Sequence, residues 1–169
     1  MAEVNAGTET YSVELSKADM VFSAAHFITF AGNICERIHG HNYGVMADVR
    51  GPLDENYYVI DFIALRDTLR NQVDAWDHHV LLPTKHKSIS VETVENEVIA
   101  RFEDRRWVFP KDDCVLLDIE NTTAELLARE LGVGLLKAVE QLGLVGITEL
   151  RVGVDENNGQ WGRWHYRWE

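Results

Sequence analysis

Cysteine is scarce in this chain, which has only Cys35 and Cys114 among its 169 residues. A disulfide-stabilised secreted fold needs more cysteines, so we expect both to be free thiols. Proline is also scarce, with three residues, and no proline- or serine-rich stretch divides the chain. A chain of this length can bury one core, and we expect a single domain over residues 1–169.

Long apolar runs are absent as well. No stretch approaches the ~20 apolar residues that a membrane-spanning helix needs. The first residues contain no basic segment followed by an apolar run, as a secretory signal would. We therefore expect a cytoplasmic protein with no membrane partner.

Basic residues are outnumbered, since 16 Lys and Arg against 28 Asp and Glu give a net charge of −12. This balance argues against a nucleic-acid partner, because such binding depends on clustered Lys and Arg. An anionic small molecule would need a locally basic site, for which Arg37, Lys85 and Lys87 are candidates. Hydrophobic residues make up 46% of the chain and charged residues 26%, which is typical of a globular protein.

The periodicity of apolar residues predicts both strands and helices. Alternation predicts strands at 11–15, 20–30, 39–50 and 147–155, with a short hairpin at 59–61 and a short buried run at 115–119. Helical spacing predicts one helix over 62–75, capped by Asp61. It predicts a second from Thr122 or Thr123 to about Leu142, ended by Gly143.

Between the two predicted helices lies an unusually long connection. We interpret residues 84–113 as an insertion, and expect the alternating segments over 89–109 to form a β-hairpin. The order is strands, helix, insertion, helix and strand, without βαβ alternation. This order predicts an α+β fold, an antiparallel sheet with two helices packed on one face.

The strongest local feature is the sequence His39-Gly40-His41. Residues two apart on a strand point to the same face, so both imidazoles aim at one point. His26 lies thirteen residues earlier on the preceding predicted strand, where antiparallel pairing could bring it opposite the pair. Three neutral imidazoles with an open fourth position are typical of catalytic zinc.

Cys35 precedes His39 by four residues and leaves two interpretations open. Its thiolate could be a fourth ligand, which would make a closed structural zinc site with one sulfur and three imidazoles. It could instead lie just beyond bonding distance and act as a base, with its pKa lowered by the nearby ion.

Several motifs share one order along the chain. They are FSAAH, C-x-x-x-H-G-H-N-Y, VIDF at 59–62, Asp77-His78, NTTAELLA at 121–128 and VGVDEN at 152–157. In this order they resemble the superfamily of 6-pyruvoyl-tetrahydropterin synthase and 6-carboxytetrahydropterin synthase. The resemblance implies the tunnelling fold, in which subunits form an oligomeric ring, commonly a hexamer built as a dimer of trimers. It also implies active sites at the subunit interfaces.

The resemblance assigns a role to each matching residue. It implies zinc ligands at His26, His39 and His41, a general base at Cys35, an acid/base couple at Asp77 and His78, a pterin anchor at Glu156, and pocket residues at Thr123 and Glu125. A carboxylate suits the anchor because it can accept two parallel hydrogen bonds from a pterin edge. His79 rivals His78 and Asp155 rivals Glu156, and the sequence does not choose between them.

Three features depart from the family pattern. Glu36 follows Cys35, and in relatives that make 6-hydroxymethyl-dihydropterin a glutamate near this cysteine is the base. Thr122 and Leu126 stand where the family's second-helix motif has proline and asparagine. The third departure is the insertion at 84–113, whose role the sequence leaves open.

These observations predict a zinc-dependent lyase that converts 7,8-dihydroneopterin triphosphate by enolisation and side-chain elimination or cleavage. The first expected product is 6-carboxytetrahydropterin, on the route to queuosine. The alternatives are 6-pyruvoyl-tetrahydropterin and the folate-bypass product 6-hydroxymethyl-dihydropterin. A different class of alternative is a non-catalytic binding module, an oligomer stabilised by zinc. The product, the choice between Cys35 and Glu36 as base, and the ring size stay open.

Overall fold

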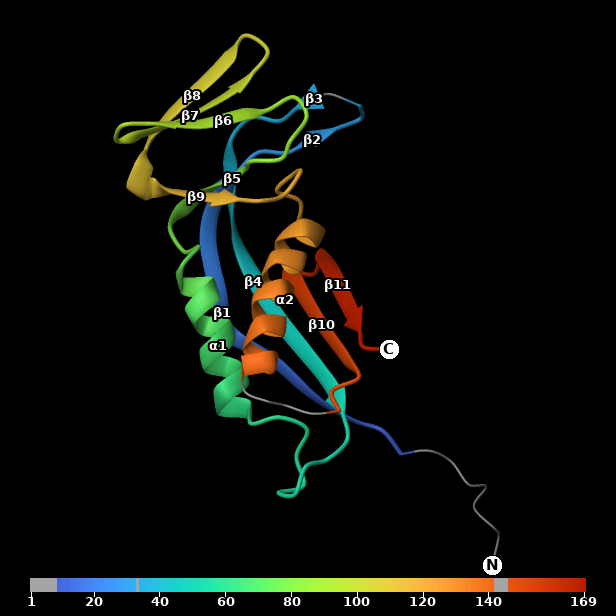
Figure 1. Ribbon diagram of the computed structural model, residues 1–169. Coiled ribbons are helices and arrows are strands. Elements are labelled where there is room, and N and C mark those ends of the chain that lie inside the picture. Colours follow the sequence, from blue (N-terminus) through green and yellow to red (C-terminus); the bar gives the residue numbers. More distant parts are fainter. Residues whose placement is uncertain (1–8, 33, 142–145) are drawn as a thin grey trace, which may run out of the picture.

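The computed structural model describes residues 9–32, 34–141 and 146–169. A six-stranded sheet in the order β11-β10-β4-β1-β5-β9 is its largest element. Its strands are β1 (Tyr11–His26), β4 (His39–Gly51), β5 (His79–Pro83), β9 (Cys114–Leu117), β10 (Glu149–Asp155) and β11 (Trp161–Arg167). The helices α1 (Phe62–Asp74) and α2 (Ala124–Gln141) cover one face of this sheet, as Figure 1 shows. The predicted α+β architecture is therefore confirmed.

The direction of the strands corrects the expectation of a wholly antiparallel sheet. Strands β1, β4, β10 and β11 pair antiparallel, but β5 pairs parallel with both β1 and β9. Strand β4 ends at Gly51, opposite Tyr11, and α1 then carries the chain back along the sheet to His79, which pairs with Ala24 near the other end of β1.

Two strand boundaries differ from the prediction. The expected strands at 11–15 and 20–30 are one strand, β1, whose register shifts between Ser16 and Val21 and which ends at His26. Strand β11 was not predicted, because most of its residues are exposed and it therefore lacks a buried alternating face. The expected hairpin at 59–61 is wrong, since no strand forms there.

Both helices bury an apolar side against the sheet. Asp61 caps α1 as predicted, since its carboxylate accepts hydrogen bonds from the main-chain N–H groups of Ile63 and Ala64. Leu69 of α1 and Leu131 of α2 are fully buried in the core. The predicted end of the second helix at Gly143 lies outside the described residues. No helix in the described ranges is long and apolar enough to cross a membrane.

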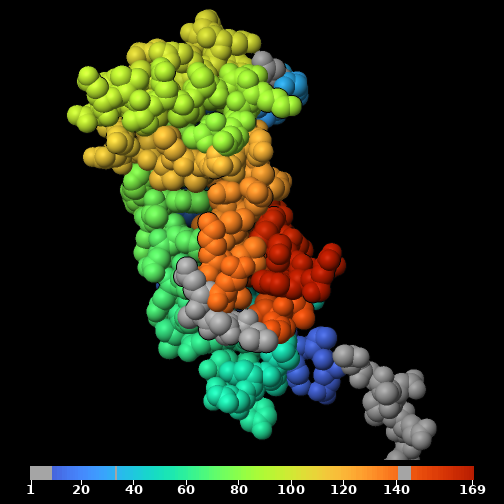
Figure 2. Space-filling model, viewed as in Figure 1, coloured from blue at the N-terminus to red at the C-terminus, as the bar shows by residue number. Residues whose placement is uncertain are grey.

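Residues 84–113 form more than the expected hairpin. They build a three-stranded antiparallel sheet from β6 (Ser90–Val94), β7 (Glu97–Phe102) and β8 (Arg105–Pro110), followed by a short 3-10 turn, Lys111–Asp113. This sheet has its own small core, which includes Phe27 from the end of β1. Figure 2 shows these residues gathered at one end of the molecule, beyond both helices. There they lie beside the hairpin of β2 (Thr29–Phe30) and β3 (Ile34–Cys35), as Figure 1 shows.

Candidate metal centre

Three imidazoles converge at the end of the sheet where β1 finishes and β4 begins. His26 pairs directly with His39 in the antiparallel register, and His41 lies opposite Ala24. One ring nitrogen from each histidine lies within 4.8 Å of the other two. A side chain at Gly40 would place its Cβ 3.1 Å from the main-chain oxygen of Ala24, so glycine allows the close strand approach between the two histidines.

Hydrogen bonds fix the tautomer of two of these rings. Nδ1 of His26 lies 2.9 Å from the main-chain oxygen of Thr122, and Nδ1 of His39 lies 2.9 Å from that of Arg37. A carbonyl only accepts, so each Nδ1 must carry the proton and each Nε2 keeps its lone pair. Metal-binding histidines in proteins are oriented by this type of bond.

The environment of His26 Nε2 fits a bound cation. This atom is buried and has no hydrogen-bond partner among the described residues. Burial lowers the pKa of His26 to about 4, so the ring is neutral near pH 7. An oxygen of the Glu156 carboxylate lies 3.3 Å from this nitrogen, and with the proton on Nδ1 the two atoms face each other as acceptors. A metal ion would satisfy the nitrogen, and the three-histidine group could therefore hold one.

Cys35 does not join the three histidines. Among the described residues, the group of mutually close ligand atoms contains no sulfur. The Cys35 thiol is half-buried and makes a weak hydrogen bond of 3.5 Å to the main-chain oxygen of Glu36. Burial raises the pKa of this thiol. The closed site with three imidazoles and one thiolate is therefore not what the structure favours.

A cavity of about 320 Å³ lies at the start of α2, and Glu156 in its lining approaches His26 to 3.3 Å. Its lining includes Thr123, Glu125 and Glu156, the three residues that the family resemblance assigns to the pterin pocket. The rival carboxylate, Asp155, is engaged elsewhere, because it accepts hydrogen bonds from the main-chain N–H groups of Gly159 and Gln160. Glu156 therefore remains the carboxylate that connects the cavity with the histidine group.

Asp77 and His78 form a hydrogen-bonded pair. Oδ2 of Asp77 accepts from Nδ1 of His78 at 2.9 Å, while Nδ1 of the rival His79 donates to the main-chain oxygen of Asp77 instead. Oδ1 of Asp77 also accepts from the main-chain N–H of Ser23 at 2.7 Å, which lowers the pKa of Asp77. His78 has a φ of 60°, an uncommon conformation for a side-chain-bearing residue, and this presents its ring to solvent.

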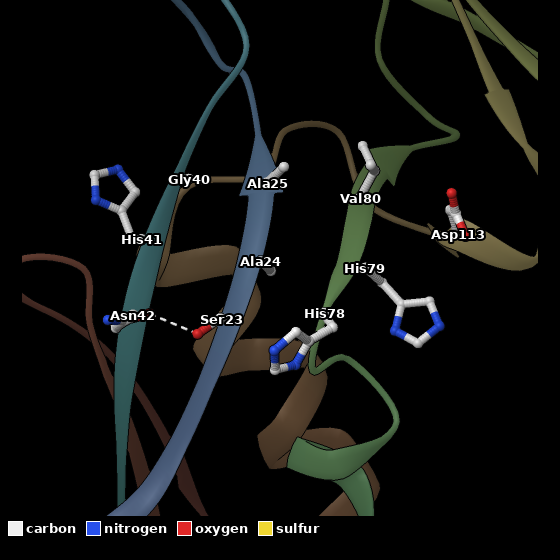
Figure 3. A pocket seen from close by; sticks show the side chains of 10 residues that line it. All are labelled: Ser23, Ala24, Ala25, Gly40, His41, Asn42, His78, His79, Val80 and Asp113. Atoms are coloured by element: carbon white, nitrogen blue, oxygen red, sulfur yellow. Dashed lines mark hydrogen bonds between the residues drawn. The ribbon is translucent and has the colours of Figure 1, made fainter.

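The Asp77–His78 pair lies outside the histidine group of its own chain. His78 borders a cavity of about 440 Å³ whose lining includes His41 of the histidine group and three of its strand neighbours, Ser23, Ala25 and Asn42. On β1 and β4 these three residues alternate with the metal-site histidines and therefore point to the opposite face of the sheet. In Figure 3 the His41 ring leaves β4 on the side away from β1, while the His78 ring lies between β1 and β5.

Thr122 has a function in this site that the sequence did not reveal. It is fully buried, its hydroxyl donates to the main-chain oxygen of Phe27, and its own main-chain oxygen orients His26. The sequence showed only a departure from the family's proline. A main-chain acceptor leaves no side-chain signal, so no residue pattern could have revealed it.

The candidate basic residues all lie on the surface. Lys85 forms an ion pair of 3.1 Å with Asp118 on the surface. Arg37 and Lys87 are exposed.

Comparison with known proteins agrees with the geometry. The family model described as 6-pyruvoyl tetrahydropterin synthase matches residues 14–165. A protein of Methanocaldococcus jannaschii, provisionally named 6-carboxy-5,6,7,8-tetrahydropterin synthase, is 31% identical over 144 residues, 85% of this chain and 88% of that protein.

Solved structures of similar proteins share the fold. A Plasmodium vivax 6-pyruvoyltetrahydropterin synthase, solved as a variant with a catalytic glutamate replaced by alanine, superposes with a TM-score of 0.87 at 28% identity. The Plasmodium falciparum enzyme superposes with the same TM-score at 29% identity. In both cases the match covers 95% of this chain and 99% of the other. This chain belongs to the 6-pyruvoyl tetrahydropterin synthase family.

Proposed function

We propose that this protein is a cytoplasmic, zinc-dependent lyase that converts 7,8-dihydroneopterin triphosphate to 6-carboxytetrahydropterin, a step of queuosine biosynthesis. One observation carries the proposal. The three-histidine group and the cavity of Thr123 and Glu125 meet at Glu156, whose carboxylate lies 3.3 Å from His26. In this proposal the metal centre and a pocket for the flat polar ring are adjacent in one chain.

Each side chain has a chemical role in this proposal. His26, His39 and His41 hold the metal, and a zinc ion there would supply Lewis acidity to an oxygen of the substrate side chain. Glu156 accepts two parallel hydrogen bonds from the ring N–H and exocyclic amine of the pterin, which fixes its orientation. Thr123 and Glu125 border the ring.

Two residues compete for the role of proton acceptor. We infer that Cys35 takes the proton from the substrate side chain, because the family resemblance assigns it that role. Glu36 is the alternative, since the Plasmodium vivax relative is described with a catalytic glutamate. If Glu36 is the base, the folate-bypass product 6-hydroxymethyl-dihydropterin becomes the expected one.

The position of Asp77 and His78 supports an oligomeric site. His78 would serve as the second acid/base group, held and charged by the Asp77 carboxylate. Since this pair points to the sheet face opposite the histidines of its own chain, we propose that it acts on the metal centre of a neighbouring copy. A ring of subunits, with a hexamer as the expected form, would provide that neighbour.

The test is to incubate the zinc-loaded protein with 7,8-dihydroneopterin triphosphate and identify the pterin products by mass. The proposal expects 6-carboxytetrahydropterin together with release of acetaldehyde. A pyruvoyl or hydroxymethyl product would correct the substrate chemistry within the family. Absence of any substrate consumption by zinc-loaded oligomer would contradict the enzymatic proposal and favour a zinc-stabilised binding module.

A further inference from the structure

The three-stranded sheet of residues 84–113 contacts the segment that carries both candidate bases. Arg105, the first residue of β8, donates from Nη1 to the main-chain oxygen of Cys35 and from Nη2 to that of Glu36, both at 2.9 Å. A guanidinium group presents its donors in a rigid planar fork, so one side chain binds two successive carbonyls at once. These two bonds join segments 69 and 70 residues apart in the sequence.

Aromatic packing fixes the position of Arg105 itself. Its guanidinium carbon lies 4.6 Å from the ring centre of Trp107, two residues further along β8. Trp107 in turn stacks on Phe27, with ring centres 4.5 Å apart. Phe27 follows the metal-site residue His26 directly. The arginine is therefore anchored to the same end of β1 that positions the histidine group.

The segment from Cys35 to Arg37 is held at each main-chain oxygen. Arg105 binds the first two oxygens, and Nδ1 of His39 donates to the oxygen of Arg37 at 2.9 Å. The main-chain N–H of Glu36 donates to the oxygen of Ile28 at 3.0 Å. The backbone that carries the two candidate bases is therefore hydrogen-bonded to the 84–113 sheet on one side and to His39 on the other.

We propose that Arg105 is a positioning residue for the base. Through it, the 84–113 sheet fixes the Cys35–Glu36 backbone beside the metal centre. This inference rests on the proposed function for its catalytic consequence, but the backbone contact stands without it. Without the Arg105 hydrogen bonds, the base segment would keep the pairing of Cys35 with Thr29, the bond from Glu36 to Ile28 and the bond from His39 to Arg37, but its first two main-chain oxygens would lose their guanidinium donor. Small displacements of a reacting group can cost about 100-fold in rate.

The experiment compares Arg105→Met and Arg105→Lys with the matched control Arg106→Ala, an exposed arginine that is next to it on β8. We expect Arg105→Met to lower kcat by about 10–100-fold with little change in KM or zinc content. Lysine should rescue only part of this loss, because a single ammonium cannot reproduce the planar fork. Arg106→Ala should match the unsubstituted protein.

A second readout reports the backbone directly. Hydrogen exchange in the peptide covering residues 34–38 should become faster in Arg105→Met and stay unchanged in Arg106→Ala. Unchanged exchange, or full kcat in Arg105→Met, would overturn the positioning role. If the unsubstituted protein consumes no substrate, the proposed function fails, and the exchange rates alone then decide whether Arg105 holds the segment.

Discussion

The main-chain oxygen of Thr122 accepts a hydrogen bond from Nδ1 of His26, 96 residues earlier, at 2.9 Å. Thr122 lies two residues before α2, so the start of this helix sets the tautomer of a histidine on β1. The bond leaves His26 Nε2 as a buried lone pair that has no hydrogen-bond partner among the described residues. A desolvated nitrogen of this kind costs free energy unless a ligand satisfies it.

Replacing His26 by alanine should remove metal binding. Two imidazoles cannot hold the ion as three do, so we expect the affinity for zinc to fall by about 100-fold or more. Metal content after dialysis against a competing chelator measures the loss. His165→Ala is the matched control, because this half-exposed histidine lies on β11 outside the histidine group. Equal zinc retention in both variants would show that His26 is not a ligand.

Asp77→Asn should lower turnover without changing the zinc content of the protein. The amide cannot orient and charge the His78 ring as the carboxylate does, so we expect kcat to fall by about 100-fold while zinc content stays constant. Asp113→Asn serves as the control, since Asp113 borders the same cavity. Unchanged turnover in Asp77→Asn would remove the pair from the mechanism.

The opposite orientations of His78 and the histidine group predict complementation between inactive variants. His39→Ala lacks a metal ligand but supplies His78, whereas His78→Ala supplies an intact histidine group. A working site needs a histidine group from His78→Ala and a His78 side chain from His39→Ala. When equal amounts assemble at random, about one interface in four has this combination, so roughly a quarter of the full activity should return. Activity measured after co-refolding tests this. A mixture as inactive as each variant alone would place both groups in one subunit's site.

The histidine group could be predicted from the sequence because the alternation of a strand decides which side chains share a face. His39 and His41 share a face two residues apart, and His26 pairs opposite His39 as expected. What the sequence could not predict depends on contacts between distant segments. The carbonyl of Thr122 and the fork of Arg105 act on main-chain oxygens, which every residue carries. The edge strand β11 was missed because it lacks a buried alternating face.

Gly162 of β11 packs closely against the start of α2, beside the cavity of Thr123 and Glu125. A Cβ at this position would lie 2.5 Å from the main-chain nitrogen of Glu125, at the start of α2. We expect Gly162→Ala to destabilise the protein by about 1–3 kcal/mol, since backbone cannot move aside cheaply. Thermal unfolding measures the change. Gly44→Ala is the control, because its Cβ would make an ordinary contact of 3.4 Å with Asp155. A smaller shift in Gly162→Ala than in Gly44→Ala would contradict this account of the packing.

The central claim is that three imidazoles bind the metal and the Cys35 sulfur does not. X-ray absorption at the zinc edge of the loaded protein tests it most directly, because zinc–sulfur and zinc–nitrogen bonds differ in length, at about 2.3 and 2.0–2.1 Å. The account predicts a first shell of three imidazole nitrogens and one further light atom. A sulfur neighbour at about 2.3 Å, or fewer than three imidazoles, would contradict it.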